Sequence, residues 1–412
     1  VNGNLPALRP DIVGEYFVFD WLFEKRAKTI HDFILTIWKY PVLAAIFFER
    51  LIQDFGHLLN EFPERWDILF TDSILSFKNA SLYYSQYVLN ATYYCNAVEQ
   101  CEKLVSLLDK FVTRYPNNPE IAIAFAGSLF NLSNKQDRQD AEGTVKRLEK
   151  FYADHSDITE VTAELAKGFF NLSNKQDGKD AEKTIGCLEK LYIKHSDAVE
   201  ITILFAKGLF NLSCEQNVQD AEKTAWRLEN LYNEHPNITE IATELAKCLY
   251  NLSRRQDEQG MKSTVNRLEK LYTEHLGVDE MAILLAKGLF NLSIKQNEQD
   301  VVNTMRCLKK LSNEHPNVTQ IAAVYAGVML NLIIEQNTES TANLLEKLSN
   351  EQVYMLEIIV EYVNGQLNLR MKQDEPGVEN IQKHLEELTS EHPDVVQIAD
   401  VITKKLFYLN NK

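Results

Sequence analysis

The stretch from Glu200 to His235 reads EITILFAKGLFNLSCEQNVQDAEKTAWRLENLYNEH, and related stretches precede and follow it. Its Asn-Leu-Ser triplet recurs every 40 residues. The triplet begins at Asn131, Asn171, Asn211, Asn251 and Asn291, and a variant Asn-Leu-Ile begins at Asn331. A fixed period of this size is typical of repeat proteins, in which each unit buries its apolar surface against its neighbours. The sequence therefore predicts a solenoid.

Each repeat contains the pattern of two helices. In the unit that begins at Glu120, apolar residues from Ile121 to Phe130 recur at steps of one, three and four, which is the spacing of one helix face. The second half begins near Asp137, carries a similar stripe and ends at His155. We therefore expect an all-α fold of antiparallel helix pairs.

Polar residues ahead of these helices predict caps. Asn117 stands three residues before Glu120, and Asp157 stands three before Glu160, which is the spacing of a capping box. The second helix of each unit begins after an Asp or Asn, a preferred N-cap residue type. These residues are Asp137, Asp177, Asn217, Asp257 and Asn297.

The repeat resembles the tetratricopeptide repeat (TPR), which pairs two antiparallel helices. The first helix carries a small residue at its middle: Gly168, Gly208 and Gly288, with Ser128 and Cys248 in other units. The second helix carries an early Ala: Ala141, Ala181 and Ala221. Pro follows the second helix at Pro116, Pro236, Pro316 and Pro393. The resemblance implies a right-handed superhelix, although TPR units are usually about 34 residues long and HEAT and armadillo repeats share the longer period.

Residues 1–70 do not follow the repeat, and we expect them to form a separate helical region ahead of a repeat array over residues 71–412. The sequence predicts one helix near Pro10, a second over 30–40, and a third from Pro41 to Asn60. The C-terminal end of the array is predicted to close with a helix over 395–409.

The segment from Leu8 to Val18, LRPDIVGEYFV, resembles a sequence that follows the ATPase core of bacterial STAND NTPases. There it belongs to a winged-helix region that joins the motor to a C-terminal repeat array. In antiviral members the array senses a phage protein, and the ATPase then oligomerises and switches on an effector. The resemblance implies that this chain is such a sensor, with an ATPase upstream of Val1 through which it would oligomerise.

Composition argues against several other functions. The chain has 43 Lys and Arg against 59 Asp and Glu, a net charge of −16, which disfavours nucleic acid and anionic membranes as partners. The longest apolar run, from Val42 to Phe48, is too short to span a bilayer. Six Cys without zinc-like spacing suggest buried free thiols in the cytoplasm. The sequence shows no catalytic motif, so we expect no enzyme activity, cofactor or metal.

A polar strip runs beside the apolar face of each first helix. On a helical wheel that places Ile121 at 0°, the apolar face spans about 0–180° around the helix axis. Gly127 then lies at about 240° and Asn131 at about 280°, outside that face. Four later units place Lys where the first has Gly127: Lys167, Lys207, Lys247 and Lys287. First helices line the concave groove of stacked repeats, so this ladder of Lys and Asn would suit carboxylates or an acidic peptide.

A structural explanation of the same ladder is also open at this point, and it is the favoured one. Each Lys would then pair with a carboxylate three residues back, such as Glu164 or Glu244, and each Asn would bond its neighbours. A secondary candidate surface is the Tyr-rich start of the array. It contains Tyr83, Tyr84, Tyr87, Tyr93 and Tyr94.

Two functions follow from these observations. The first is a protein-interaction module, namely the sensor of a STAND NTPase that recognises a phage protein in bacterial immunity. The alternative is a TPR-type scaffold or chaperone-like adaptor that binds acidic peptide segments. A P-loop ATPase encoded upstream of Val1 would favour the first.

Overall fold

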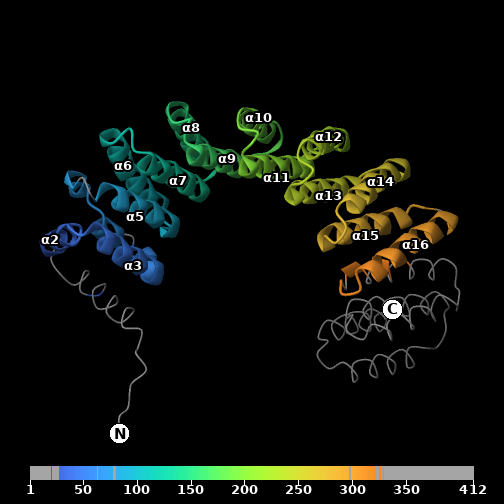
Figure 1. Cartoon of the computed structure of the whole chain (residues 1–412), viewed down its shortest axis with the longest axis horizontal. Coiled ribbons are helices and arrows are strands. Elements are labelled where there is room, and N and C mark those ends of the chain that lie inside the picture. The colour runs from blue at the N-terminus through green and yellow to red at the C-terminus, as the bar shows by residue number, and fades with distance from the viewer. Residues whose placement is uncertain are drawn as a thin grey trace, which may run out of the picture. The chain divides into compact units, whose positions relative to one another are not determined.

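The computed structural model describes residues 20, 27–62, 64–77, 80–296, 298–318, 320–321, 324–325 and 328 (Figure 1). These residues form 15 α-helices and a short 3-10 helix without any strand, and successive helices pack against one another. The all-α prediction is confirmed. The chain divides into two compact units, which meet between Leu212 and Ser213. The expected helix near Pro10, the region from Asn331 onward and the closing helix over 395–409 lie outside the described residues.

Unit 1 holds the non-repetitive start and the first repeats. Its helices are α2 (Ala27–Ile37), α3 (Pro41–Glu61), α4 (Glu64–Leu69), the 3-10 helix η1 (Asp72–Ser76), α5 (Ser81–Tyr94), α6 (Val98–Arg114), α7 (Pro119–Lys135), α8 (Arg138–Asp154), α9 (Thr159–Asn174) and α10 (Gly178–Lys194). Helix α11 (Val199–Glu215) contains the boundary between the units.

Unit 2 continues the same alternation. Its helices are α12 (Val218–Glu234), α13 (Thr239–Ser253), α14 (Glu258–Glu274), α15 (Asp279–Ser293) and α16 (Glu298–Glu314). From α7 onward, each odd-numbered helix contains an Asn-Leu-Ser triplet, and each even-numbered helix forms the second half of a repeat. The 40-residue period therefore predicts the helix pairs correctly.

The packing within each unit follows the apolar stripes. In unit 1, α7 packs on both α5 and α9, and α6 and α8 pack against α7. In unit 2, α13 packs on α15, and α14 packs against both. The stripe residues Ile121, Leu129 and Leu132 of α7 are completely buried. Burial of such stripes is the main source of stability in helices of this length.

A small residue at the middle of the odd-numbered helices lets the second helix of the preceding repeat approach closely. A Cβ added to Gly208 would lie 2.5 Å from Ile185 Cδ1, and one added to Gly168 would lie 3.4 Å from Leu148 Cδ2. Ser128 and Cys248 occupy the equivalent position and are almost fully buried. Close packing against the second helix of the preceding repeat therefore explains the small residue that the TPR resemblance depends on.

The predicted caps are confirmed for α8, α12 and α14, whereas Asp177 at the start of α10 makes no side-chain cap and Asn297 lies outside the described residues. Asp137 accepts a hydrogen bond from the Asp140 backbone N–H at 3.0 Å, and Asp257 accepts one from Gly260 at 2.8 Å. Asn217 caps α12 in the same way. These bonds satisfy amide groups that the first turn of a helix leaves without partners.

The capping box predicted for the odd-numbered helices is wrong. The N-cap residues are Asn118 for α7, Ile158 for α9 and Ile238 for α13, one residue later than the box requires. Ile158 and Ile238 make no side-chain cap. A backbone hydrogen bond closes the preceding turn instead, for example from the Ile158 N–H to the His155 carbonyl at 3.1 Å.

These two kinds of helix start differ in their response to mutation. Asp137→Ala removes a formed cap and should lower the free energy of unfolding by about 1 kcal/mol. Asp157→Ala removes an exposed side chain that caps nothing, and should cost less than about 0.5 kcal/mol. Urea denaturation of both variants measures the difference, and equal losses would contradict the cap assignment.

The start of unit 1 shares one aromatic core with the first repeat. Trp38 and Phe48 stack with ring centroids 6.0 Å apart, and the Trp38 ring meets Tyr84 edge-on at 4.8 Å. Tyr87 lies 5.7 Å from Trp38 and 4.7 Å from Phe70. The observed helix α3 agrees with the helix predicted from Pro41 to Asn60. Residues on both sides of position 70 thus stabilise the same core.

Candidate protein-binding face

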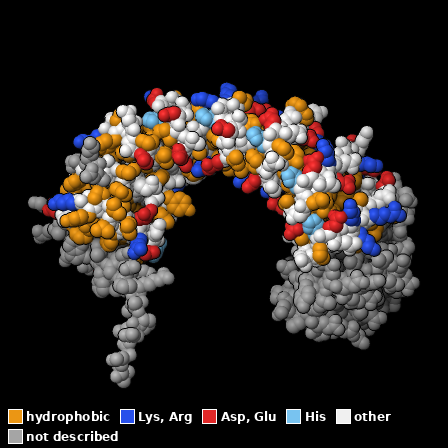
Figure 2. Space-filling view, in the orientation of Figure 1, with side chains coloured by type: hydrophobic (Ala, Val, Ile, Leu, Met, Phe, Trp, Pro, Cys, Tyr) orange, Lys and Arg blue, Asp and Glu red, His pale blue; other side chains and the backbone are white. Residues whose placement is uncertain are grey.

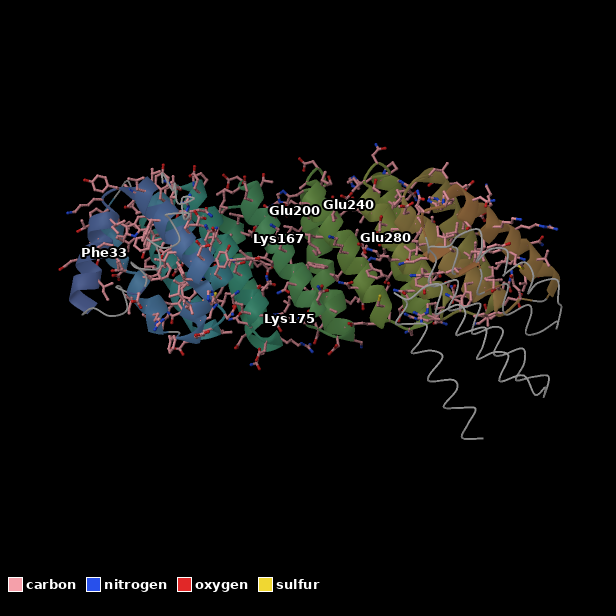
Figure 3. The ribbon with its side chains drawn as sticks, turned by 90° about the horizontal axis from the view of Figure 1, so that it is seen from below. Phe33, Lys167, Lys175, Glu200, Glu240 and Glu280 are labelled. Atoms are coloured by element: carbon pink, nitrogen blue, oxygen red, sulfur yellow. The ribbon has the colours of Figure 1, made fainter. Side chains whose placement is uncertain are left out.

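The candidate binding face is the exposed side of the odd-numbered helices, where the repeated Lys and Asn residues lie. In unit 1, Lys167 Nζ lies 3.1 Å from Glu164 Oε1 on its own helix and 3.1 Å from Glu200 Oε1 on α11. Figure 3 shows Lys167 and Glu200 beside each other on this face. Burial raises the pKa of Glu164, and the Lys167 ammonium partly offsets that rise.

Unit 2 repeats the same arrangement at Lys247. Its Nζ lies 3.3 Å from Glu244 Oε1 and 3.3 Å from Glu280 Oε1, and Glu244 is buried. Burial alone lowers the pKa of Lys247, but the two carboxylates outweigh it and the pKa lies above its ordinary value. The pairs with Glu164 and Glu244 are those that the structural explanation of the ladder predicts, and the second pairs, with Glu200 and Glu280, join successive repeats.

The two remaining lysines of the ladder have different surroundings. Leu204 and Leu284 stand three residues before Lys207 and Lys287, where the other two units have Glu. Among the described residues, neither Lys207 nor Lys287 lies within ion-pair distance of a carboxylate. Both lysine residues are partly exposed. The ladder therefore alternates between paired and unpaired lysines.

The Asn residues of the ladder are half-buried at contacts between repeats. Asn131 Nδ2 donates to Thr92 Oγ1 at 3.0 Å, and Asn211 Nδ2 donates to Asn174 Oδ1 at 2.8 Å. Asn251 Nδ2 lies 3.3 Å from Cys214 Sγ. The buried Nδ2 atoms of Asn171 and Asn291 have no hydrogen-bond partner among the described residues. Three of these Asn residues thus contact the preceding repeat, and Asn331 lies outside the described residues.

A half-buried aromatic residue precedes each Asn on this face, a feature that the sequence analysis missed. The residues are Phe130, Phe170, Phe210, Tyr250 and Phe290. Each one stands directly before the Asn of its triplet, so its conservation of type from repeat to repeat is the signal that could have revealed it. The face combines ammonium groups, amides and aromatic edges.

The Tyr-rich start of the array divides into core and surface residues. Tyr84 and Tyr87 are buried in the aromatic core of unit 1, and Tyr84 exchanges hydrogen bonds with the Thr71 backbone. Tyr93 is 66% exposed and Tyr83 is 39% exposed, and Tyr94 is half-buried. Apolar side chains gather on this part of unit 1 in Figure 2. Only Tyr83, Tyr93 and Tyr94 reach the surface.

A second set of contacts between repeats runs along the ends of the even-numbered helices. Tyr152 Oη lies 2.8 Å from His195 Nε2 in unit 1. In unit 2, Tyr232 Oη lies 2.8 Å from His275 Nε2, and Tyr272 Oη lies 2.9 Å from His315 Nε2. These three His residues therefore receive a partner from the preceding repeat, in addition to their place at a helix C-terminus.

A Gln–Thr hydrogen bond stabilises each helix pair from within. Thr144 Oγ1 donates to Gln136 Oε1 at 2.6 Å, and Thr224 Oγ1 donates to Gln216 Oε1 at 2.7 Å. The same bond occurs in the other described repeats. Gln and Thr occupy these two positions in all five units. This identity is the sequence signal from which the hydrogen bond could have been predicted.

A basic side chain caps the C-terminus of the preceding odd-numbered helix. In unit 1, Lys175 Nζ donates to the carbonyls of Ser133, Asn134 and Gln136 at 2.6–2.9 Å (Figure 3). In unit 2, Arg255 donates to the Ser213 carbonyl at 3.1 Å. A cation at this end of a helix meets unpaired carbonyls and the negative end of the macrodipole.

His195 should make unit 1 sensitive to acid. Burial lowers the pKa of His195, and the Lys194 ammonium lowers it further. The folded state therefore holds this proton less tightly than the unfolded chain, whose His pKa is about 6.5. The contribution to stability is complete above about pH 6.5 and is lost as the pH falls toward the folded pKa.

We expect His195→Gln to reduce the loss of stability between about pH 7.5 and about pH 5.5. Urea denaturation of the wild-type chain and the variant at both pH values measures this change. An unchanged pH dependence in the variant would contradict the assignment of this titration to His195.

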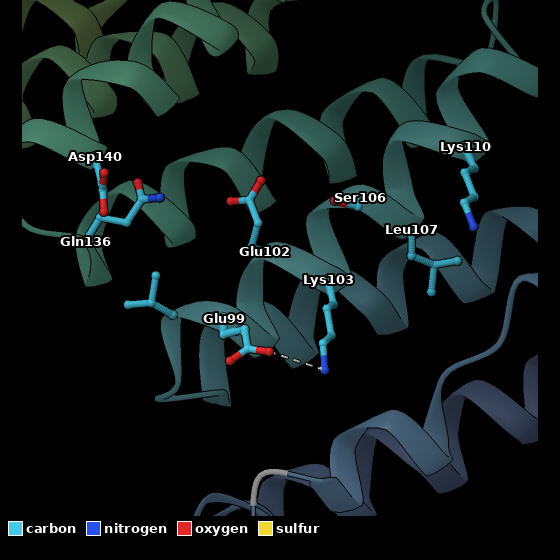
Figure 4. Close-up of a pocket in the computed structure, with 9 residues that line it drawn as sticks. Glu99, Glu102, Lys103, Ser106, Leu107, Lys110, Gln136 and Asp140 are labelled. Carbon is cyan, nitrogen blue, oxygen red and sulfur yellow. Dashed lines mark ion pairs between the residues drawn. The ribbon is translucent and has the colours of Figure 1, made fainter.

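The groove between α6 and α8 offers little for a ligand. It has a volume of about 670 Å³ and is lined by residues that include Glu99, Glu102, Lys103 and Lys110 (Figure 4). Lys103 pairs with Asp67 at 3.0 Å, and Lys110 pairs with Asp72 at 2.9 Å. Lys103 also lies 3.8 Å from Glu99 within the groove (Figure 4), so both lysines are already paired with carboxylates of the chain.

Other kinds of site find no support in the part of the chain that the structure describes. No group of three His, Cys, Asp or Glu residues there could hold a metal ion. No described helix has the length and apolar character needed to cross a membrane. All six Cys are free, and Cys214 is exposed, so the expectation that the thiols are buried is wrong for that residue.

Comparison with known proteins does not place the chain in a family. No family model matches the sequence, and no curated protein matches it significantly.

Proposed function

We propose that this chain is a protein-binding TPR-like α-solenoid with a right-handed superhelix, which recognises its partner through the face of the odd-numbered helices. Lys207 and Lys287 carry the proposal. They repeat the ladder although no carboxylate pairs with them among the described residues. An ammonium group in such a position is available to a carboxylate on a partner.

The exposed positions of the even-numbered helices support this interpretation. Lys146 is replaced in later repeats by Gly186, Trp226, Asn266 and Arg306. Exposed residues have therefore diverged since the repeats arose. Pairing with Glu accounts for the constancy of Lys167 and Lys247, but it does not account for Lys207 and Lys287.

The biological setting that we propose is bacterial antiviral defence in the cytoplasm. The segment from Leu8 to Val18 and the repeat array that follows it resemble the C-terminal part of a STAND NTPase. In that setting the chain binds a phage protein and performs no catalytic step, while an ATPase upstream supplies the response and the oligomerisation.

An adaptor that binds acidic peptide segments is the second candidate. The partly exposed side chains of Lys207 and Lys287 favour it, because the carboxylates of an acidic peptide could pair with either one.

The deciding experiment mixes the purified chain with individually purified phage proteins and analyses each mixture by size-exclusion chromatography. The sensor proposal expects a stable complex with a folded phage protein. Binding of a labelled polyglutamate peptide, without any such complex, would favour the adaptor. If neither interaction is observed, the proposal that the odd-numbered helices bind a protein partner is overturned.

A further inference from the structure

Trp226 is an exposed tryptophan on an even-numbered helix of unit 2. Its side chain on α12 is 61% exposed, whereas Trp38 and Trp66 are completely buried. The equivalent residues of the other repeats are Lys146, Gly186, Asn266 and Arg306, so the packing of the repeats does not require an aromatic residue here. Tryptophan is the residue type most enriched among the anchors of protein interfaces.

A groove lies along the same face, between α12 and α14. It has a volume of about 560 Å³, and its lining includes Val218, Glu222 and Lys223 of α12 and Gly260 of α14. Trp226 follows Glu222 by four residues and Lys223 by three, so it continues the helix face that lines the groove. A projecting ring and a hollow therefore lie next to each other on one surface.

Two positions in the wall of the groove carry smaller, uncharged residues in α14 than in α10 and α12. In α10, Lys183 pairs with Asp180 at 3.1 Å, and in α12, Lys223 pairs with Asp220 at 2.8 Å. The residues at these two positions of α14 are Gly260 and Ser263. The same substitutions remove side-chain volume and charge from the wall of the groove.

The charges that line the groove are satisfied within the chain. Glu222 pairs with Arg267 at 2.7 Å, and Lys223 pairs with Asp220 at 2.8 Å. The lining is thus close to neutral, although the whole chain carries a net charge of −16. Two copies of an acidic protein repel each other, and a neutral, partly apolar patch is where that repulsion is least.

We propose that this surface joins two copies of the chain in a symmetric dimer, in which Trp226 of each copy enters the α12–α14 groove of the other. A two-fold interface uses the same patch on both partners, so it needs a projection and a matching hollow on one surface. The proposal does not depend on the proposed function, because it concerns the even-numbered helices.

The test is the mass of the chain in solution, measured by sedimentation and by light scattering over a range of concentrations. The wild-type chain should approach twice its monomer mass of 47.4 kDa. Trp226→Ala should weaken association by about 30-fold or more. Gly260→Asp should do the same by placing a carboxylate in the wall of the groove, and it should fold because Asp140, Asp180, Asp220 and Asp300 occupy this position in the other repeats. Lys262→Ala, an exposed change on the opposite side of α14, is the control and should leave the dimer intact.

A mixture of the two variants tests the geometry itself. The Trp226→Ala chain keeps its groove, and the Gly260→Asp chain keeps its tryptophan, so the mixture can form one of the two contacts. It should associate more tightly than either variant alone. A wild-type chain that stays monomeric at all concentrations, or a dimer that survives Trp226→Ala, would overturn the proposal. A mixture no better than its components would also overturn it, because it would show that the ring does not enter the groove.

Discussion

Trp38→Ala will lower the free energy of unfolding of unit 1 by about 3–5 kcal/mol, the usual range for removing a large aromatic side chain from a core. The Trp38 ring is completely buried and meets Phe48, Tyr84 and Tyr87 within 6.0 Å between centroids. Alanine leaves a cavity that these rings, held by their own contacts, cannot close. Urea denaturation followed by circular dichroism measures the loss.

The same substitution at Trp226 is the matched control. Trp226 is mostly exposed, so Trp226→Ala should change the stability of the monomer by no more than about 0.5 kcal/mol. Measurement at a concentration where the chain is monomeric separates this effect from any effect on association. Similar losses for the two variants would show that Trp38 does not lie in a packed core.

Trp38→Phe separates ring packing from the indole N–H. The Trp38 Nε1 atom is buried without a hydrogen-bond partner among the described residues, and an unsatisfied donor of this kind costs about 1–3 kcal/mol. Phenylalanine keeps much of the ring contact and removes that cost. It should therefore be clearly less destabilising than alanine.

The helices of this chain could be predicted from sequence because their apolar spacing is regular over many residues. Pro41 and the stripe that follows it predict a helix over 41–60, and α3 runs from Pro41 to Glu61. The caps of the odd-numbered helices could not be predicted in the same way, since they depend on the first helical residue to within one position. The tight turn after His155 moves that start by one residue and leaves Asp157 outside the helix.

The candidate site shows the same limit. Helical periodicity predicts that Glu164 and Glu244 face the lysines three residues later, because both members of each pair lie on one helix. The second partners, Glu200 and Glu280, come from the next repeat. Their approach depends on how two helices pack, which a residue pattern within one helix does not contain.

The second large expected effect is on partner binding, and it concerns the unpaired lysines Lys207 and Lys287. If a partner binds along the odd-numbered helices, Lys207→Glu with Lys287→Glu should weaken binding by about 1.5–3 kcal/mol for each lost contact to a charged group. The stability of the chain should change by less than about 1 kcal/mol, because neither lysine is ion-paired among the described residues. Calorimetric titration with the phage protein identified by chromatography measures the affinity.

Lys167→Glu with Lys247→Glu is the matched pair, with the same change of charge at the same helix position. Each substitution places a carboxylate between two others, at Glu164 and Glu200 or at Glu244 and Glu280. Because Glu244 is buried and loses its counterion, this pair should destabilise the chain by about 1.5–3 kcal/mol per site. If both pairs reduce stability equally, the whole ladder is structural and the partner binds elsewhere, with Tyr83, Tyr93 and Tyr94 as the next surface to mutate. If only the unpaired lysines affect binding, and only the paired ones affect folding, one sequence ladder serves two purposes that alternate from repeat to repeat.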